Sequence, residues 1–539
     1  MKKIHLYLSV SLLLFAASCS ESEVEKLLAE ESDLITISSI IPSDIDETKK
    51  DQLMSEKKID EVRHMFDKFS WESFIAINWP VNENGEPMEH LKDDGLPTWY
   101  NWKEAFEVFR DKGKKPEKWN SNRTTPNWIL DHDNAPGNTK KSVRLLFNTN
   151  KAINVADEDM QAFAGPLFDQ NGNLLRYEVL MNEEEFDYIL KNKLYNINGQ
   201  IDFSQSDSDK ADFPAGVYEE ITKVGAVEIK ISWKVLVKGK DDFSRYLNVP
   251  SFVLSEDKKS WDKVTAGMVG FHINHKTSSA SQWVWSTFEH VDNLATNSLE
   301  TFEYEGNQIP IKPSFYDPDC ETCPTNVWLQ SDSSKFIARD GTYKKYHRSY
   351  YIPEDKIIKG SDKDYYIGQA HRMIPIPERL QELNRDIQEQ LKLQESPLQY
   401  YELVGTQWPK NQQKTPADPT YAAFPNSVEN KPGGDPDPIY LTNMTMETYF
   451  QNGNQGAYNF MENGSQPTDN NEKMIFGTES CMGCHSSAGI ANHRPATMKA
   501  AREGSFYGGQ LSADFVWLLN TQAHWKDNDT LTTTIKPQK

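Results

Sequence analysis

One short motif constrains this chain more than any other feature of its sequence: the five residues from Cys481 to His485 read C-x-x-C-H. Two thiols at this spacing can each form a thioether bond to a vinyl group of haem, and the histidine that follows then lies under the iron as its proximal ligand. The motif therefore predicts one covalent haem c held by Cys481, Cys484 and His485. A redox-active dithiol and half of a zinc site are the alternatives. The zinc alternative needs a second pair of ligands nearby, and the next cysteine before the motif is as distant as Cys323.

The N-terminus has the features of an export signal, which covalent haem requires because it is attached outside the cytoplasm. Lysines follow Met1, and the apolar core at residues 6–17 is too short to span a bilayer as a mature helix. Small residues then precede Cys19, as in the lipobox of bacterial lipoproteins, although Ala16 stands where leucine is usual. We predict that residues 1–18 are a lipoprotein signal peptide and that lipid on Cys19 anchors the chain in the bacterial cell envelope, on the periplasmic side or the cell surface. Ordinary secretion with cleavage nearby is the alternative.

The remaining two cysteines, Cys320 and Cys323, form a second C-x-x-C pair that no histidine follows. This pair therefore does not predict a second haem. In an oxidising compartment, two cysteines this close within a proline-containing turn are most simply a local disulfide. A redox-active disulfide and a pair of metal ligands are the alternatives.

The charge of the chain narrows the set of expected partners. The formal net charge is −22, and an acidic chain without a basic stripe is not expected to bind nucleic acid. After the leader, no apolar run is long enough to predict a transmembrane helix. The expected partners are the membrane, through the anchor at Cys19, and a redox partner protein or a small-molecule substrate.

The pattern of apolar residues predicts an α+β domain at residues 61–409, after an acidic tether at residues 19–60. Helical spacing covers residues 62–77 and 376–393. Alternation typical of strands covers several other runs: 145–147, 177–180, 226–235, 246–254, 264–275, 282–288 and 401–408. No helix long enough for a parallel crossover is expected between these runs, so we predict a largely antiparallel sheet with flanking helices.

The C-terminal part is predicted to be a separate, small all-α domain. Residues 410–438 are rich in Pro, Asn, Gly and Asp and are predicted to be a linker or a long surface loop. Residues 439–539 then contain a candidate helix at 441–450, the C-x-x-C-H motif and a second candidate helix at 512–519, in the order of a small c-type cytochrome. A cytochrome c-like haem domain is implied here by resemblance.

The chain as a whole, from about residue 65 to about residue 525, resembles a group of bacterial, Bacteroidetes-like cytochrome c-family lipoproteins without an assigned activity. The resemblance rests on three stretches: residues 69–80, with FSWESF and NWP, residues 283–290, WVWSTFEH, and residues 480–488, SCMGCHSSA. It implies one haem, export and a large companion domain, and it implies no substrate.

The sixth ligand of the iron decides whether such a site carries electrons or binds a further ligand. Met498 lies between the motif and the second candidate helix, in the interval where small c-type cytochromes carry a methionine ligand. We therefore predict His485 and Met498 as the two axial ligands. The alternatives are an open position or one of four other donors: His493, His524, Met444 and Met446.

These features predict a membrane-anchored extracytoplasmic c-type cytochrome that transfers electrons. The alternative is a haem-dependent oxidoreductase with a substrate or metal site in the α+β domain, and a surface binding protein with a structural haem is a third interpretation. For a metal site, His272 and His275 lie on one candidate strand, and we expect both imidazoles to face one side of it. A transition-metal site needs three convergent donors, and hydrogen-bonded structural histidines are the alternative. No catalytic residue is assigned.

Overall fold

The computed structural model describes most of the chain between residues 35 and 526. The described residues are 35–123, 133–134, 144–146, 167–206, 210–254, 260–296, 299–320, 323, 325–326, 354–359, 365–372, 374–412, 435–438, 440–448, 481–486, 488–497, 500–501, 504–508 and 511–526. The expected signal peptide, Cys19 and Met498 lie outside these residues, as do parts of the expected tether and most of the expected linker.

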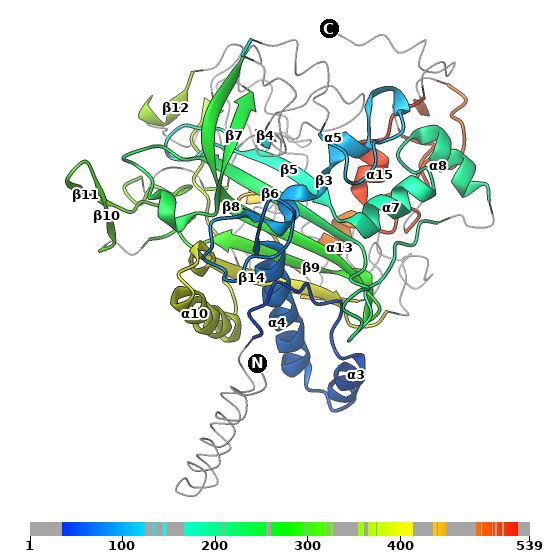
Figure 1. Cartoon of the computed structure of the whole chain (residues 1–539), viewed down its shortest axis with the longest axis horizontal. Helices are drawn as coiled ribbons and strands as arrows, with labels where there is room; N and C mark the ends of the chain where they lie inside the picture. Colours follow the sequence, from blue (N-terminus) through cyan, green and yellow to red (C-terminus); the bar gives the residue numbers. More distant parts are fainter. Residues whose placement is uncertain are drawn as a thin grey trace, which may run out of the picture.

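One large sheet organises the fold (Figure 1). Within the described residues its main path runs through β15 (Pro436–Asp437), β14 (Tyr401–Pro409), β9 (Ala280–His290), β8 (Trp261–Thr277), β6 (Val227–Val235), β5 (Arg176–Met181) and β3 (Lys103–Glu104). Beside β8 lies β7 (Asn248–Leu254), which also pairs with β4 (Arg144–Leu146). The pairings are antiparallel apart from the parallel β4–β7 pair. The prediction of an α+β fold with a largely antiparallel sheet is confirmed.

Helices and small strand pairs surround this sheet. The helices are α3 (Glu47–Ser55), α4 (Ile59–Ile77), α5 (Ala105–Val108), α7 (Glu183–Lys191), α8 (Ile197–Ser204), α10 (Glu378–Leu393), α13 (Cys481–His485) and α15 (Trp517–Thr521). The small antiparallel pairs are β1 (Pro80–Val81) with β2 (Leu96–Pro97), β10 (Thr301–Tyr304) with β11 (Asn307–Pro310), and β12 (Ile357–Ile358) with β13 (Tyr365–Tyr366). A disulfide joins Cys320 and Cys323.

Helices α4 and α10 cover one face of the sheet, which we call the helix face. Phe74 of α4 stacks on Phe288 of β9, with ring centroids 4.1 Å apart, and meets Phe271 of β8 edge-on at 5.5 Å. Trp71 Nε1 of α4 donates to Asn384 Oδ1 of α10 at 2.9 Å, which ties the two helices together. The apolar spacing that predicts helices at 62–77 and 376–393 is therefore the spacing of residues buried against this face.

The opposite face of the same strands is polar, and we call it the motif face. Because side chains alternate along a strand, the neighbours of Phe271 and Phe288, namely His272 and Thr287, point away from α4. His272 and Thr287 lie directly opposite each other in the register of β8 and β9, and Asn274 lies opposite Trp285 two residues further on. Helix α13 contacts β9, which brings the C-x-x-C-H motif to this face.

The C-terminal residues form less helix than expected. Residues 441–448, expected to be helical, form turns because the N–H groups of Asn443 and Met444 donate to the carboxylates of Glu447 and Glu289. In the range 512–519, helix begins only at Trp517, after a turn. Met482, Phe515 and several other apolar residues beyond 480 pack in a core cluster with side chains of the sheet. Others, such as Phe506, pack with Ile197 of α8. An all-α domain separate from the sheet is not confirmed.

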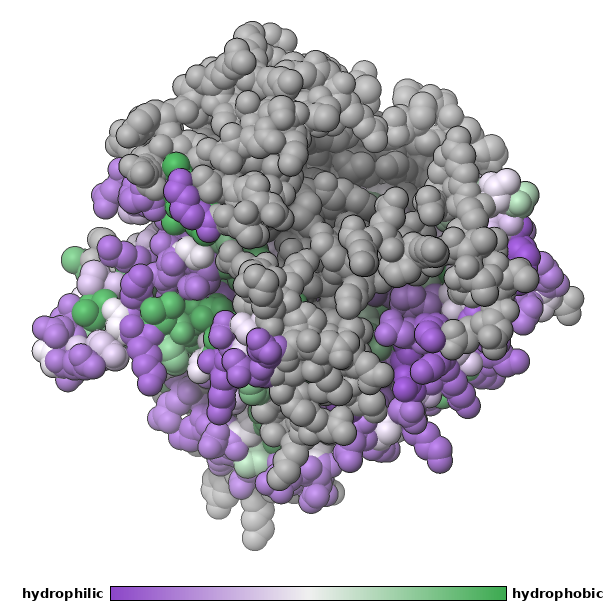
Figure 2. All heavy atoms as spheres, turned by 90° about the horizontal axis from the view of Figure 1, so that it is seen from above, coloured by the Kyte–Doolittle hydropathy of each residue, from purple (hydrophilic) through white to green (hydrophobic). Residues whose placement is uncertain are grey.

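The described part of the surface in Figure 2 is mostly hydrophilic and carries hydrophobic residues in small patches. Among the described residues, no helix has both the length and the apolar content that crossing a membrane would require.

Candidate haem-binding site

The C-x-x-C-H motif forms the short helix α13 on the motif face. Spacings of three and four residues place Cys481, Cys484 and His485 on one side of this helical turn. Both cysteines are present as thiols. The backbone N–H of Met482 donates to Gln407 Oε1 of β14 at 2.8 Å, and the Met482 side chain is fully buried. The helix therefore presents two thiols and one imidazole together, while the sheet fixes its position.

The imidazole of His485 has the arrangement of a metal ligand. Nδ1 lies 2.8 Å from the backbone carbonyl of Phe515, and because a carbonyl only accepts hydrogen bonds, we assign the ring proton to Nδ1. The lone pair is then on Nε2, as in metal-ligating histidines held by a backbone carbonyl. The ring also packs against Trp285, with centroids 4.5 Å apart. Burial lowers the pKa of His485 to about 4, which keeps the imidazole neutral, as ligation requires.

A turn held by a buried ion pair brings the Phe515 carbonyl to this position. Asp514 and Phe515 have φ values of 49° and 69°, a left-handed conformation that residues other than glycine rarely adopt. Lys276 Nζ of β8 lies 2.9 and 2.8 Å from the two carboxylate oxygens of Asp514. Asp514 also accepts the backbone N–H of Phe213 at 2.9 Å. Strained turns persist only where their surroundings hold them, so we infer that the ion pair positions the carbonyl that orients His485.

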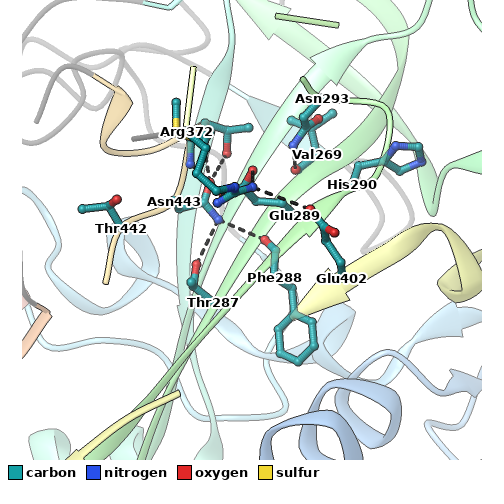
Figure 3. Close-up of polar contacts among 12 residues, drawn as sticks. Val269, Thr287, Phe288, Glu289, His290, Asn293, Arg372, Glu402, Thr442 and Asn443 are labelled. Carbon is teal, nitrogen blue, oxygen red and sulfur yellow. Dashed lines mark hydrogen bonds and ion pairs between the residues drawn. The ribbon is translucent and has the colours of Figure 1, made fainter. Parts of the chain in front are cut away.

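Polar contacts with β9 hold the segment 440–448 on the motif face (Figure 3). Asn443 Nδ2 donates to Thr287 Oγ1 and to the Phe288 carbonyl, each at 2.9 Å, and the N–H of Met444 donates to Glu289 Oε1 at 2.8 Å. These bonds satisfy polar groups that the sheet would otherwise bury without a partner.

A partly buried arginine balances the charge of Glu289. Arg372 donates to both carboxylate oxygens of Glu289, at 3.2 and 2.9 Å, and lies 3.6 Å from Glu402 (Figure 3). The segment held in this way places the carbonyl of Leu441 3.8 Å from Cys481 Sγ. Cys481 thus lies against the segment 440–448, which hydrogen bonds to β9 hold in place.

The environment of the first thiol separates the haem interpretation from the dithiol interpretation. Burial raises the pKa of the Cys481 thiol well above its usual range, and the neighbouring Glu447 carboxylate adds to this shift. A reactive dithiol needs a lowered thiol pKa, so this environment disfavours redox-dithiol chemistry. The donor set of two thiols on one helical side and a neutral, oriented imidazole fits a covalently attached haem.

The candidate donors for the sixth position are held elsewhere or are not described. Met498 lies outside the described residues. Met444 and Met446 are fully buried in a core cluster distinct from the two that Cys481 contacts. The backbone carbonyl of His524 accepts the N–H of Ile197 at 3.1 Å beside α8, and exposed His493 lies on a loop with Nδ1 2.5 Å from Asn492. These positions give no support to the four alternatives to Met498.

The expectation that His272 and His275 face one side of their strand is wrong. Residues three apart in a regular strand point to opposite faces. His275 lies on the helix face, 5.2 Å from the Phe69 ring between centroids, whereas His272 Nε2 lies 3.5 Å from Glu447 on the motif face. In the part of the chain that the structure describes, no group of three or more His, Cys, Asp or Glu residues could hold a metal ion.

Sequence reasoning missed the residues that support the motif: Trp285, Lys276, Gln407 and Asp514. Their contacts join distant parts of the chain, with sequence separations of 75 from Gln407 to Met482 and 238 from Lys276 to Asp514. One signal was present, because Trp285 lies in the stretch 283–290 that carries part of the family resemblance.

Comparison of the chain with protein-family models finds no match. Comparisons with curated proteins and with solved structures also find none.

Replacing Lys276 tests whether the ion pair supports the site. Lys276→Met leaves the Asp514 carboxylate buried without its cation, which we expect to lower the free energy of unfolding by about 3–5 kcal/mol. Chemical denaturation measures this change. Lys92→Met is the control, because Lys92 pairs with Glu395 at the surface, where such pairs contribute about 0–1 kcal/mol. Equal stability of the two variants would contradict the role assigned to Lys276.

Proposed function

We propose that this chain is an extracytoplasmic c-type cytochrome that transfers electrons through one covalent haem. The observation that carries the proposal is the orientation of His485, whose Nδ1 is held by the Phe515 carbonyl so that Nε2 is left with the lone pair. A chance match to the motif would supply two cysteines and a histidine in the sequence. It would not supply the hydrogen bond that holds Nδ1 of the histidine. The cytochrome c-family resemblance and the export signal agree with the proposal.

In this function the residues of the chain have distinct roles. Cys481 and Cys484 would hold the haem through thioether bonds, and His485 would bind the iron through Nε2. A haem held in this way supplies a one-electron couple, whose potential depends on the axial ligands, on hydrogen bonds to them and on burial. The Phe515 carbonyl and the Trp285 ring fix the orientation of the imidazole.

Covalent attachment is the first property to test. Co-expressed with cytochrome c maturation factors, the wild-type protein should retain haem stain after denaturing electrophoresis. The double variant Cys481→Ala/Cys484→Ala should lose the stain, because both thioether bonds are removed. Cys320→Ala/Cys323→Ala is the matched control and should keep it. A wild-type band without haem stain would rule out the proposed function.

A second candidate function, an oxidoreductase, is favoured by a cavity lined in part by Leu441, which also lies against Cys481. The cavity has a volume of about 460 Å³, within the range of small-molecule sites. Its wall is mainly apolar and includes Val404, Ile376 and Leu441, with Arg372 and Thr442 among its polar residues. The carbonyl of Leu441 is the one that lies 3.8 Å from Cys481 Sγ. A substrate in this cavity would therefore be close to the thioether bond of the first cysteine.

Carbon monoxide separates the two functions, because it binds ferrous haem only where the sixth position is open or easily vacated. We propose Met498 as the sixth ligand, so the reduced wild-type spectrum should not change when CO is added. Met498→Ala should open the position and shift the spectrum with CO, whereas the control Met54→Ala on α3 should behave as the wild type. CO binding by the wild type would instead favour the oxidoreductase. If Met498→Ala matches the wild type, Met498 is not the ligand.

We propose that lipid on Cys19 anchors the protein in the cell envelope. Cys19→Ala should then release a protein that is still loaded with haem into the soluble fraction, because its lipid attachment point is gone. Cell fractionation followed by haem staining measures this. If the variant stays in the membrane pellet after a salt wash, another anchor must hold it.

A further inference from the structure

Two carboxyl groups are buried on the motif face with few partners. Glu185 of α7 is fully buried, and Glu228 of β6 is nearly so. Within the described residues, both carboxyl oxygens of Glu185 and Oε2 of Glu228 make no hydrogen bond, while Glu228 Oε1 accepts from Asn274 Nδ2 at 3.1 Å. A buried carboxylate without partners is costly, and the usual response is to bind a proton.

The pair lies close to the proposed proximal ligand. Glu228 is directly opposite Asn274 in the β6–β8 register, and Asn274 is directly opposite Trp285 in the β8–β9 register. The Trp285 ring packs on His485. Two strand spacings of about 4.8 Å therefore separate Glu228 from the strand on which the imidazole rests, a distance of about 10 Å.

Few cations face these carboxyl groups. Glu185 on α7 faces Glu228 and Asp514, and their negative charges add to the effect of burial, which raises the pKa of Glu185 well above its usual range. Burial also raises the pKa of Glu228 to about 7, although Asn274 and Lys230 oppose this, and that of Asp514 to about 6, although Lys276 opposes this. Asp212 also raises the pKa of Asp514.

We propose that Glu185 and Glu228 form a proton-binding site that is linked to the redox state of an iron bound by His485. The proposal rests on the proposed function. When one electron arrives from a donor protein, the pair takes one proton from solvent and an O–H bond forms on one carboxylate. When an acceptor protein removes the electron, that O–H bond breaks and the proton returns to solvent. Charge and atoms balance as one proton per electron.

The size of the linkage follows from Coulomb's law. At an effective dielectric constant of about 20, a unit charge about 10 Å from a carboxylate would change its proton affinity roughly tenfold, and a larger separation would lower this factor. The ferric state carries one more positive charge than the ferrous state, so it favours the ionised pair. The ferrous state favours the protonated pair.

The reduction potential as a function of pH tests the proposal on the full-length, haem-loaded protein. For the wild type, the potential should fall as pH rises around pH 7, by up to about 30 mV per pH unit, because a tenfold change in proton affinity corresponds to about half a proton per electron at most. Glu228→Gln and Glu185→Gln should each reduce this slope, and the double variant should remove most of it. Asp169→Asn is the matched control, since Asp169 is a buried carboxyl with a pKa raised to about 6, and it should keep the wild-type slope.

A flat wild-type profile, or a double variant with the wild-type slope, would overturn the proposal while leaving the proposed function intact. Failure to attach haem would instead overturn the proposed function. Proton binding by Glu185 and Glu228 is then measured in the haem-free protein. There, the free energy of unfolding of the wild type should fall as pH rises from about 5 to 8, because the folded state binds more protons than the unfolded state. Glu185→Gln/Glu228→Gln should lessen this fall, and an unchanged fall would show that the pair binds no proton.

Discussion

The motif face is polar and buried at the same time, and the rest of the structure depends on that constraint. Strands β6, β8 and β9 lie inside the sheet, and successive residues along much of each strand are buried, so chain covers both faces there. The polar side chains on the motif face obtain their partners from distant segments, as Glu289 does from Arg372 and Lys276 from Asp514. A buried polar group left without a partner costs about 1–3 kcal/mol. The long connections of the chain are therefore held on the sheet by their hydrogen bonds and ion pairs with its buried polar side chains.

This constraint explains why the site needs the whole domain. Helix α13 has five residues, too few for a helix to be stable alone in water. Gln407 of β14 holds its first turn, Trp285 of β9 supports the imidazole, and the turn at Asp514 supplies the carbonyl that orients it. Met482 and Phe515 share a core cluster with Trp285. In the part of the chain that the structure describes, the sheet is thus a component of the site.

The strands were predictable from the sequence, because apolar residues alternate along them with a period of two. The runs 226–235 and 401–408 were expected as strands and correspond to β6 and β14, because alternation is local and survives in a single sequence. The motif was equally readable, since its chemistry fixes its spacing. The turn at Asp514 was not predictable, because its backbone conformation depends on Lys276 in a distant strand. The expectation for His272 failed for a simpler reason, since three residues along a strand reverse the face.

The buried charged groups of this protein differ in whether they have ion-pair or hydrogen-bond partners. That difference helps to distinguish structural from functional groups. Arg144 with Glu178 and Arg245 with Asp292 are ion pairs within the fold, so each of these two carboxylates faces a guanidinium. Stability alone gives no strong reason to keep such pairs, because apolar residues often replace them without loss, and it gives still less reason to bury Glu185 without hydrogen bonds. Groups with strongly perturbed ionisation gather at functional sites. Within the described residues, the Glu185 carboxyl, whose two oxygens make no hydrogen bond, therefore lies where the chemistry of the motif offers a use for it.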